Sequence, residues 1–226
     1  IDLHGTTGGI LQGSVQVRNA HAAPVDQNGL PLLGVTAQVR LSAARWQLQQ
    51  LDVQLPNDGH ITGALSWETG SGKGSAQLQV HDLATSALHT RLPNTRLQGD
   101  ITLGGAAGDL HAVVALSDGK LEVHGELKQQ GGQIELSEMR LTRGETVLTG
   151  HGQLALDRRR SFRLFSQLRK LNLSEFAATP TTELNAEMEV SGSLLPEAEG
   201  TLQFDLFDSH FAQYDISGSG HLEFAG

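Results

Sequence analysis

The stretch "DISGSGHLEF", Asp215–Phe224, has apolar residues and glycines at every second position. In an extended chain, Ile216, Leu222 and Phe224 lie on one face together with the two glycines, and polar residues lie on the other. This alternation predicts a β-strand with one apolar and one polar face. The glycines raise a question, because a core-facing position normally carries a side chain that becomes buried.

The same pattern recurs along the chain. "LTGHGQLAL", Leu148–Leu156, repeats it step for step, and related copies begin at Leu11, Ile61, Leu97 and Gly200. The interleaved positions are mostly polar in each copy. Each copy therefore predicts a strand with one dry and one wet face.

A longer period underlies these strands. "WQLQQLDV", Trp46–Val53, matches "IELSEMRL", Ile134–Leu141, which lies 88 residues further on. Both segments change face after their second apolar residue, and this phase slip predicts a β-bulge at the same point in each. Three more matches follow at offsets of 87 to 90 residues: Leu83–Leu88 with Leu171–Phe176, Pro93–Gly105 with Pro180–Gly192, and Leu116–Leu121 with Leu206–Phe211.

These ordered matches predict one continuous repetitive β unit over residues 1–226, with approximate repeats at 1–45 (partial), 46–133 and 134–226. The chain begins at Ile1 within an alternating segment and shows no secretion signal. We therefore expect it to be a piece of a longer protein.

The expected fold is all-β: an elongated, strongly curved repeat sheet of antiparallel type that forms a groove. Short helical connections are expected at Leu83–Leu88 and Leu171–Ala178, where Pro93 and Pro180 follow. The basic segment Arg158–Lys170 can be drawn as an amphipathic helix, but its apolar residues alternate, which favours a strand.

Composition excludes several classes of protein. Hydrophobic residues make up 38% of the chain and aromatic residues 4%, so Leu, Val, Ile and Ala must supply most of the apolar surface. The net charge of −9 argues against a nucleic-acid partner. The absence of cysteine excludes disulfides and Cys-based zinc sites and fits an oxidising compartment. The longest apolar run, Ala112–Leu116, is far shorter than a membrane helix.

The sequence offers no constellation for catalysis. "GSGKGS", Gly70–Ser75, lacks the residues of a phosphate-binding loop and is read as a hairpin connection. No two histidines have the i, i+4 spacing of a helical zinc site. His124, His151 and His221 fall on polar strand faces, where solvent exposure is the simplest interpretation. We expect no enzyme activity, no metal and no cofactor.

The apolar face is the remaining candidate for function. Its glycines predict a sheet that bends sharply and leaves space, and such an apolar trough favours an acyl chain, which gains about 0.8 kcal/mol per buried CH₂. The glycines are Gly13, Gly63, Gly99, Gly150, Gly152, Gly218 and Gly220. The predicted groove-lining residues are Leu11, Val15, Val17, Ile61, Leu65, Leu97, Ile101, Leu103, Leu148, Leu154, Leu156, Leu202, Phe204, Leu206, Ile216, Leu222 and Phe224.

The order of the matched segments resembles the repeats of the AsmA-like superfamily, and within it those of the TamB family. The motifs are Leu-x-x-Ser-x-Φ, then Pro-x-Thr-x-Leu-x-[Gly/Ala]-x-Φ-x-Φ-x-Gly, then Leu-x-Asp-[Gly/Ser]-x-Φ, where Φ is an apolar residue. The resemblance runs from about Leu11 to Phe224. It implies a taco-shaped β structure in the periplasm, in a full-length protein anchored to the inner membrane.

The same resemblance implies a function. Such proteins are thought to carry phospholipid between the inner and outer membranes, and TamB proteins are linked to outer-membrane protein assembly through a TamA-like barrel partner. The regions for the anchor and the partner are expected to lie outside this chain. The leading hypothesis is thus a non-enzymatic lipid conduit.

Two alternatives remain open. The chain is also compatible with an elongated structural scaffold or adhesin-like rod whose core packs on itself and binds no lipid. A carbohydrate-binding β-sandwich would need exposed aromatic platforms, for which Trp46 and Trp67 offer little. Bound lipid in the purified protein separates the first hypothesis from both.

Overall fold

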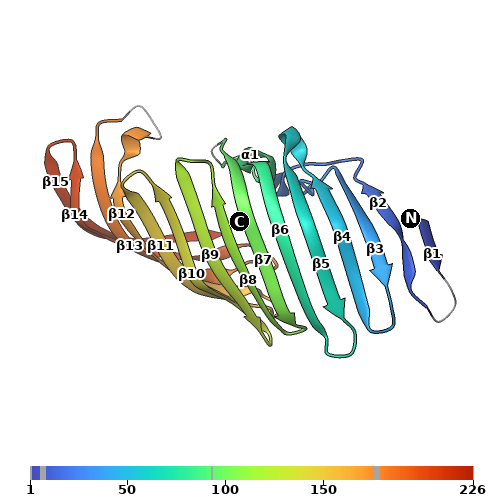
Figure 1. Cartoon of the computed structure of the whole chain (residues 1–226). Helices are drawn as coiled ribbons and strands as arrows, with labels where there is room; N and C mark the ends of the chain where they lie inside the picture. Colours follow the sequence, from blue (N-terminus) through green and yellow to red (C-terminus); the bar gives the residue numbers. More distant parts are fainter. Residues whose placement is uncertain (1, 6–8, 93, 176–178, 226) are drawn as a thin grey trace. The chain divides into compact units, whose positions relative to one another are not determined.

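The computed structural model describes residues 2–5, 9–92, 94–175 and 179–225. Its contacts divide the chain into two compact units, residues 1–118 and 119–226. In both units each strand pairs antiparallel with the next strand in sequence, so each unit is an open antiparallel meander (Figure 1). The all-β class and the antiparallel pairing predicted from the sequence are confirmed.

In its described residues, the first unit contains eight strands and three short helices. The strands are β1 (Asp2–Gly5), β2 (Leu11–Arg18), β3 (Gly34–Leu41), β4 (Arg45–Gln54), β5 (His60–Glu68), β6 (Lys73–Ala84), β7 (Arg96–Ala106) and β8 (Asp109–Ser117). The helices are the 3₁₀ turns η1 (Val25–Gln27) and η2 (Pro56–Asp58) and the single α-helical turn α1 (Thr85–Leu88) between β6 and β7.

Over the part that the structure describes, the second unit contains seven strands and one 3₁₀ turn. The strands are β9 (Leu121–Gln130), β10 (Gln133–Arg143), β11 (Thr146–Ala155), β12 (Ser161–Leu171), β13 (Thr182–Ser193), β14 (Glu199–Phe211) and β15 (Tyr214–Ala225). The turn η3 (Leu173–Glu175) follows β12. The rest of the predicted connection Leu171–Ala178 lies outside the described residues. None of the helices in the described part of the chain has the length and apolarity needed to cross a membrane.

Local sequence signals account for several details. The basic segment Arg158–Lys170 forms most of β12, so the strand prediction there is confirmed. The glycine-rich segment Gly70–Ser75 spans the β5–β6 connection and the start of β6, as expected for a hairpin. The register shifts between Leu48 and Leu51 in β4, and between Leu136 and Met139 in β10. The two predicted bulges are therefore confirmed at equivalent points.

One sequence match does not correspond to equivalent structure. Leu206–Phe211 lies inside β14, which continues through a register shift after Leu206. In the matching segment Leu116–Leu121, by contrast, β8 ends at Ser117 and β9 begins at Leu121. Gly119 has a φ of 84° and allows the chain to turn there. The side chain at the matched position of β14, Ser209, is buried and hydrogen-bonded within the sheet.

Well-buried apolar side chains are few among the described residues. Most of them lie in the first unit, near the end of β6 that leads into α1. They are Ala37, Val39, Leu51, Leu55, Val80, Leu83, Ala84, Ala87, Leu97 and Leu116. In the second unit the buried side chains are mainly polar: Thr146, Thr182, Asn185, Ser193 and Ser209, with Ala186. The two units therefore have interiors of different chemistry.

The glycines on the apolar face have two structural roles. Gly63 and Gly99 have φ values of 154° and 146°, and a Cβ at either would overlap a backbone carbonyl oxygen of the next strand. Gly220 instead lies under the ring of Phe204, and a Cβ at Gly200 would meet both the Ser191 carbonyl oxygen and the ring of Phe224. The prediction that these glycines leave space is wrong at Gly63, Gly99 and Gly220, because neighbouring backbone or a neighbouring ring occupies the position.

Gly218 behaves as the sequence predicted. No heavy atom lies within 4 Å of the point where its Cβ would stand, so the surface next to it is open. Gly150 and Gly152 resemble the first group, since a Cβ there would meet Met139 or the backbone of β12. Most glycines of this face thus serve close packing between strands rather than a cavity.

Candidate functional site

In the first unit, the strand register collects the apolar residues on one face. Residues paired directly across two antiparallel strands lie on the same face. Leu11 pairs with Leu41, which pairs with Trp46, and Trp46 pairs with Trp67. Further along the strands the rows are Leu48, Leu65, Ala76, Leu103 and Ala112, then Gly63, Leu78, Ile101 and Val114, and then Val53, Ile61, Val80, Gly99 and Leu116. This set is the apolar face of the first unit.

The second unit has an apolar face built in the same way. Phe204 pairs with Met188 on one side and with Gly220 on the other. The rows across β11 to β15 are Leu154, Phe162, Gly192, Gly200 and Phe224; Gly152, Leu164, Val190, Leu202 and Leu222; Gly150, Ser166, Met188, Phe204 and Gly220; and Leu148, Leu168, Ala186, Leu206 and Gly218. The segment Asp215–Phe224, quoted above for its alternation, belongs to β15, which is the last strand of this face.

The structure places the predicted lining residues on the open parts of these faces, with two exceptions. Leu97 is only 6% exposed and lies at the buried end of the apolar face of the first unit, near Val80, so its side chain packs within the protein. Leu156 follows the end of β11, and its backbone N–H donates to the Gly132 carbonyl oxygen. The prediction extended the strand by one residue, because the alternation runs past the last ladder hydrogen bond.

The remaining predicted residues divide between the two units. Leu11, Val15, Val17, Ile61, Leu65, Ile101 and Leu103 lie on the apolar face of the first unit. Leu148, Leu154, Leu202, Phe204, Leu206, Ile216, Leu222 and Phe224 lie on that of the second. The structure brings each group together within its own unit.

Sequence reasoning missed several members of the faces. Val39, Leu48 and Leu78 in the first unit, and Leu164 and Val190 in the second, pair directly with face residues. Their strands lack the glycine motif that guided the selection. Plain alternation of apolar residues in these segments is the signal that identifies them.

Both apolar faces are open to solvent in part. Leu103 is 40% exposed and Leu222 is 57% exposed, and Val17, Trp46 and Phe224 are also exposed. The chain exposes 14146 Å² in total. A compact monomer of its mass would expose about 10,000 Å², and two separate compact bodies of half that mass about 12,000 Å². The excess therefore does not depend on where the two units lie, and it fits sheets that carry no covering layer.

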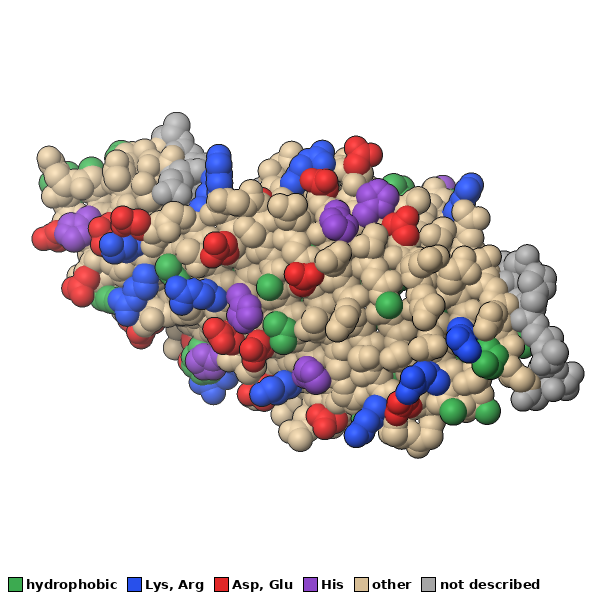
Figure 2. All heavy atoms as spheres, viewed as in Figure 1, with side chains coloured by type: hydrophobic (Ala, Val, Ile, Leu, Met, Phe, Trp, Pro, Cys, Tyr) green, Lys and Arg blue, Asp and Glu red, His purple; other side chains and the backbone are tan. Residues whose placement is uncertain are grey.

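The opposite faces of the two units are polar and carry several ion pairs. Figure 2 shows Lys, Arg, Asp, Glu and His side chains spread over the face in view, with few hydrophobic side chains. Arg45 pairs with Glu68 at 2.7 Å, and Lys170 pairs with Glu145 at 3.1 Å. Two hydrogen bonds to the Glu68 carboxylate lower its pKa: the one from Arg45 has the larger effect, and the one from Ser71 the next largest. The hydrogen bond to Glu145 raises the pKa of Lys170.

A shallow cavity of about 550 Å³ lies against the polar face of the second unit. His151 and Phe165 stack at its wall, with ring centroids 5.3 Å apart, and the guanidinium of Arg163 lies 4.7 Å from the Phe165 centroid. Glu187 and Glu189 line it as well. Because Phe165 is already in contact with a histidine and an arginine, its ring does not offer a free stacking platform.

The polar-face histidines differ in exposure. His151 and His221 are exposed, as predicted, whereas His124 is half-buried beside Glu126. Comparison with known proteins adds no assignment, because no protein-family model, curated protein or solved structure matches the chain. The apolar faces are therefore the candidate site on physical grounds alone.

Proposed function

We propose that this chain is a segment of a non-enzymatic lipid conduit, which shields phospholipid acyl chains on its apolar sheet faces. The observation that carries the proposal is the row of exposed or half-buried Leu, Val, Ile and Phe side chains along one face of each unit. Exposed apolar areas of this extent mark binding surfaces in soluble proteins. An acyl chain fits such a surface because contact with it requires no hydrogen-bond partners.

The energetics favour a long apolar ligand over a small polar one. Each CH₂ removed from water contributes about 0.8 kcal/mol, so even a partly covered acyl chain gains several kcal/mol. The gain is non-directional, and a chain can shift along the rows without breaking specific contacts. Few polar groups interrupt the rows, and Ser166 is one of them.

The finer shape is part of the proposal. We infer that the sheet curls into a groove, as the resemblance to AsmA-like repeats implies. Gly63 and Gly99 support this, because their backbone angles and close approach to the next strand distort β5 and β7 at matched positions. The bulges at Leu48 and Leu136 add further local twist.

The biological setting follows from the same resemblance. We propose a periplasmic TamB-like protein, anchored in the inner membrane through another part of the full-length chain, that moves phospholipid between the inner and outer membranes. A linked role in outer-membrane protein assembly would use a TamA-like barrel partner, bound through regions outside this chain. The absence of cysteine fits an oxidising compartment such as the periplasm.

The first test measures lipid on the purified chain. Native mass spectrometry and extraction should find phospholipid or another acyl-chain ligand bound, and a delipidated sample should take up fluorescent phospholipid from vesicles. Leu103→Asp and Leu154→Asp put a charge on the apolar face of each unit and should reduce bound lipid several-fold. Circular dichroism should stay unchanged, since Leu103 is exposed and Leu154 is half-buried.

Matched controls lie one residue away on the polar faces. Thr102→Asp and Gln153→Asp place the same charge on exposed positions of the same strands and should leave lipid uptake intact. Equal loss in these controls, or normal uptake in the Leu variants, would contradict the proposal. A rod with a self-packed core predicts no lipid in any sample and unfolding of both Leu variants.

A further inference from the structure

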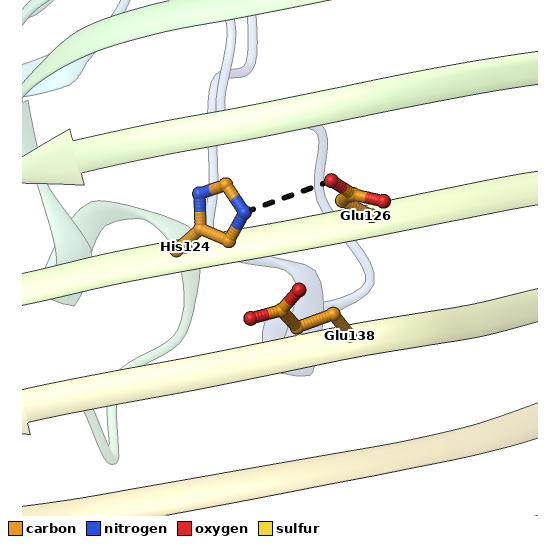
Figure 3. Close-up of side chains that lie close together, drawn as sticks. All are labelled: His124, Glu126 and Glu138. Atoms are coloured by element: carbon orange, nitrogen blue, oxygen red, sulfur yellow. Dashed lines mark ion pairs between the residues drawn. The ribbon is translucent and has the colours of Figure 1, made fainter.

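Three side chains with metal-binding groups meet on the polar face of the second unit. His124 and Glu126 lie on β9, and Glu138 lies on β10 (Figure 3). One ligand atom from each lies within 4.8 Å of the others, and His124 Nε2 is 4.0 Å from Glu126 Oε1. In Figure 3 the three side chains stand on the same side of the two strands.

Strand geometry and the β10 bulge produce this meeting. His124 and Glu126 are two residues apart, so they share one face of β9. The register shift between Leu136 and Glu138 then pairs Glu138 directly with Glu126. The Ser137 hydroxyl donates to the Glu126 carbonyl oxygen at 3.3 Å and ties the bulge to β9. Two paired strands, rather than a loop, therefore hold the backbones of all three residues.

The two carboxylates of the cluster, those of Glu126 and Glu138, would be stabilised by a bound cation. Two carboxylates directly opposite each other on adjacent strands repel and destabilise the pair. Within the described part of the chain, His124 is the group that forms an ion pair with Glu126, and no lysine or arginine pairs with either glutamate. Arg140 lies opposite His124 in the register, and Lys128 lies opposite Glu135.

We propose that His124, Glu126 and Glu138 form a binding site for a divalent transition-metal ion of the Zn²⁺ class. One imidazole and two carboxylates neutralise a doubly charged ion, and three protein ligands leave a fourth position for water. Zinc binds such nitrogen and oxygen atoms at about 2.0–2.2 Å. The ligand atoms therefore need to close by about 1–2 Å, which rotations of partly exposed side chains provide.

Access and position fit this role. His124 and Glu126 are 39% and 42% exposed, so an ion reaches them without opening the sheet. The neighbouring residues Val123, Gly125 and Leu127 belong to the opposite, apolar face, because side chains alternate along β9. The metal would link β9 to β10 across the bulge, and it is independent of lipid on the other face.

The test is a titration of the metal-stripped 226-residue chain with Zn²⁺, followed by calorimetry or competition with a chromophoric chelator. We expect one equivalent to bind and to raise the melting temperature. Glu138→Gln and His124→Asn should each weaken binding at least about tenfold, because loss of even an outer-shell partner costs 10- to 100-fold. Ca²⁺ should bind far more weakly, since it requires six or more oxygen ligands.

His151→Asn and Glu135→Gln are the matched controls, since both residues are exposed on the same polar face and stand outside the cluster. They should bind Zn²⁺ like the parent chain. The site is refuted by an absence of stoichiometric binding, or by binding that survives in Glu138→Gln and His124→Asn. Chelation of the metal should leave phospholipid uptake unchanged. Failure of the metal-site proposal can therefore be distinguished from failure of the lipid proposal.

Discussion

The bulged strands of the two units are supported by opposite chemistry. In the first unit β6 shifts register between Val80 and Leu83, and Asp82 has a φ of 49°. The surrounding side chains are apolar, and Val80 is 1% exposed. In the second unit β12 and β14 shift register beside Lys170 and Asp208, whose φ values are 51° and 42°.

A single buried amide, that of Asn185, holds the bulges of β12 and β14. Asn185 on β13 accepts a hydrogen bond from the Lys170 N–H at 3.0 Å and donates one to the Asp208 carbonyl oxygen at 2.6 Å. The Ser209 hydroxyl accepts from the Asn185 N–H at 2.8 Å. In the match of Pro93–Gly105 with Pro180–Gly192, the residue of the first unit that corresponds to Asn185 is Gln98, and Gln98 is exposed. The same backbone irregularity can thus be stabilised either by hydrophobic burial or by hydrogen bonds.

The largest expected effect comes from a charge at the apolar bulge. Val80→Asp places a carboxylate among buried apolar groups with no partner and should destabilise the first unit by more than about 4 kcal/mol. Leu103→Asp lies on the same apolar face but is 40% exposed, so it should cost about 1 kcal/mol or less. Urea unfolding monitored by circular dichroism measures both. Similar losses in the two variants would show that the open face is as buried as the bulge.

The polar bulges should be sensitive to loss of the amide. Asn185→Ala leaves the Lys170 N–H and the Asp208 carbonyl without their partners and should cost about 2–4 kcal/mol. Gln98→Ala at the matched, exposed position should change the free energy of unfolding by less than about 0.5 kcal/mol. Amide hydrogen exchange at β12 and β14 would localise the effect. A stable Asn185→Ala protein with unchanged exchange would contradict the assigned role of this side chain.

The smallest effect separates the two kinds of glycine. Gly99→Ala forces a Cβ into a backbone with a φ of 146° and against the Ala115 carbonyl oxygen, so a loss of about 2 kcal/mol is expected. Gly218→Ala meets no atom within 4 Å and should lie within about 0.5 kcal/mol of the parent. The melting temperatures of the two variants, measured by thermal unfolding, are enough to compare their stabilities. Equal stability would mean that β7 relaxes around the added methyl group.

Much of the fold could be predicted because its signals are local. Alternation identified the strands, including β12, whose basic residues also fit an amphipathic helix. The phase slips in Trp46–Val53 and Ile134–Leu141 located two bulges, since a change of face within a strand requires an extra residue. Leu156 was misplaced because alternation does not mark the last hydrogen bond of a ladder.

The candidate sites were harder to predict than the strands. The apolar residues of the quoted strand Asp215–Phe224 follow from period-two alternation alone, but the role of its glycines does not. Gly220 is covered by Phe204 from the neighbouring strand, whereas Gly218 is open, and only the register distinguishes them. The expectation that no metal binds rested on a search for helical spacings, whereas the proposed cluster has His124 and Glu126 two residues apart on a strand.

The sequence by itself determined which residues share a strand face, because the side-chain period of an extended chain depends only on its own residues. The tertiary structure decided what those faces meet. It paired Glu126 with Glu138 across the β10 bulge, buried Val80 near α1, and left Leu103 and Leu222 exposed. These outcomes depend on strand register and on neighbours distant in sequence, which alternation within one strand cannot specify.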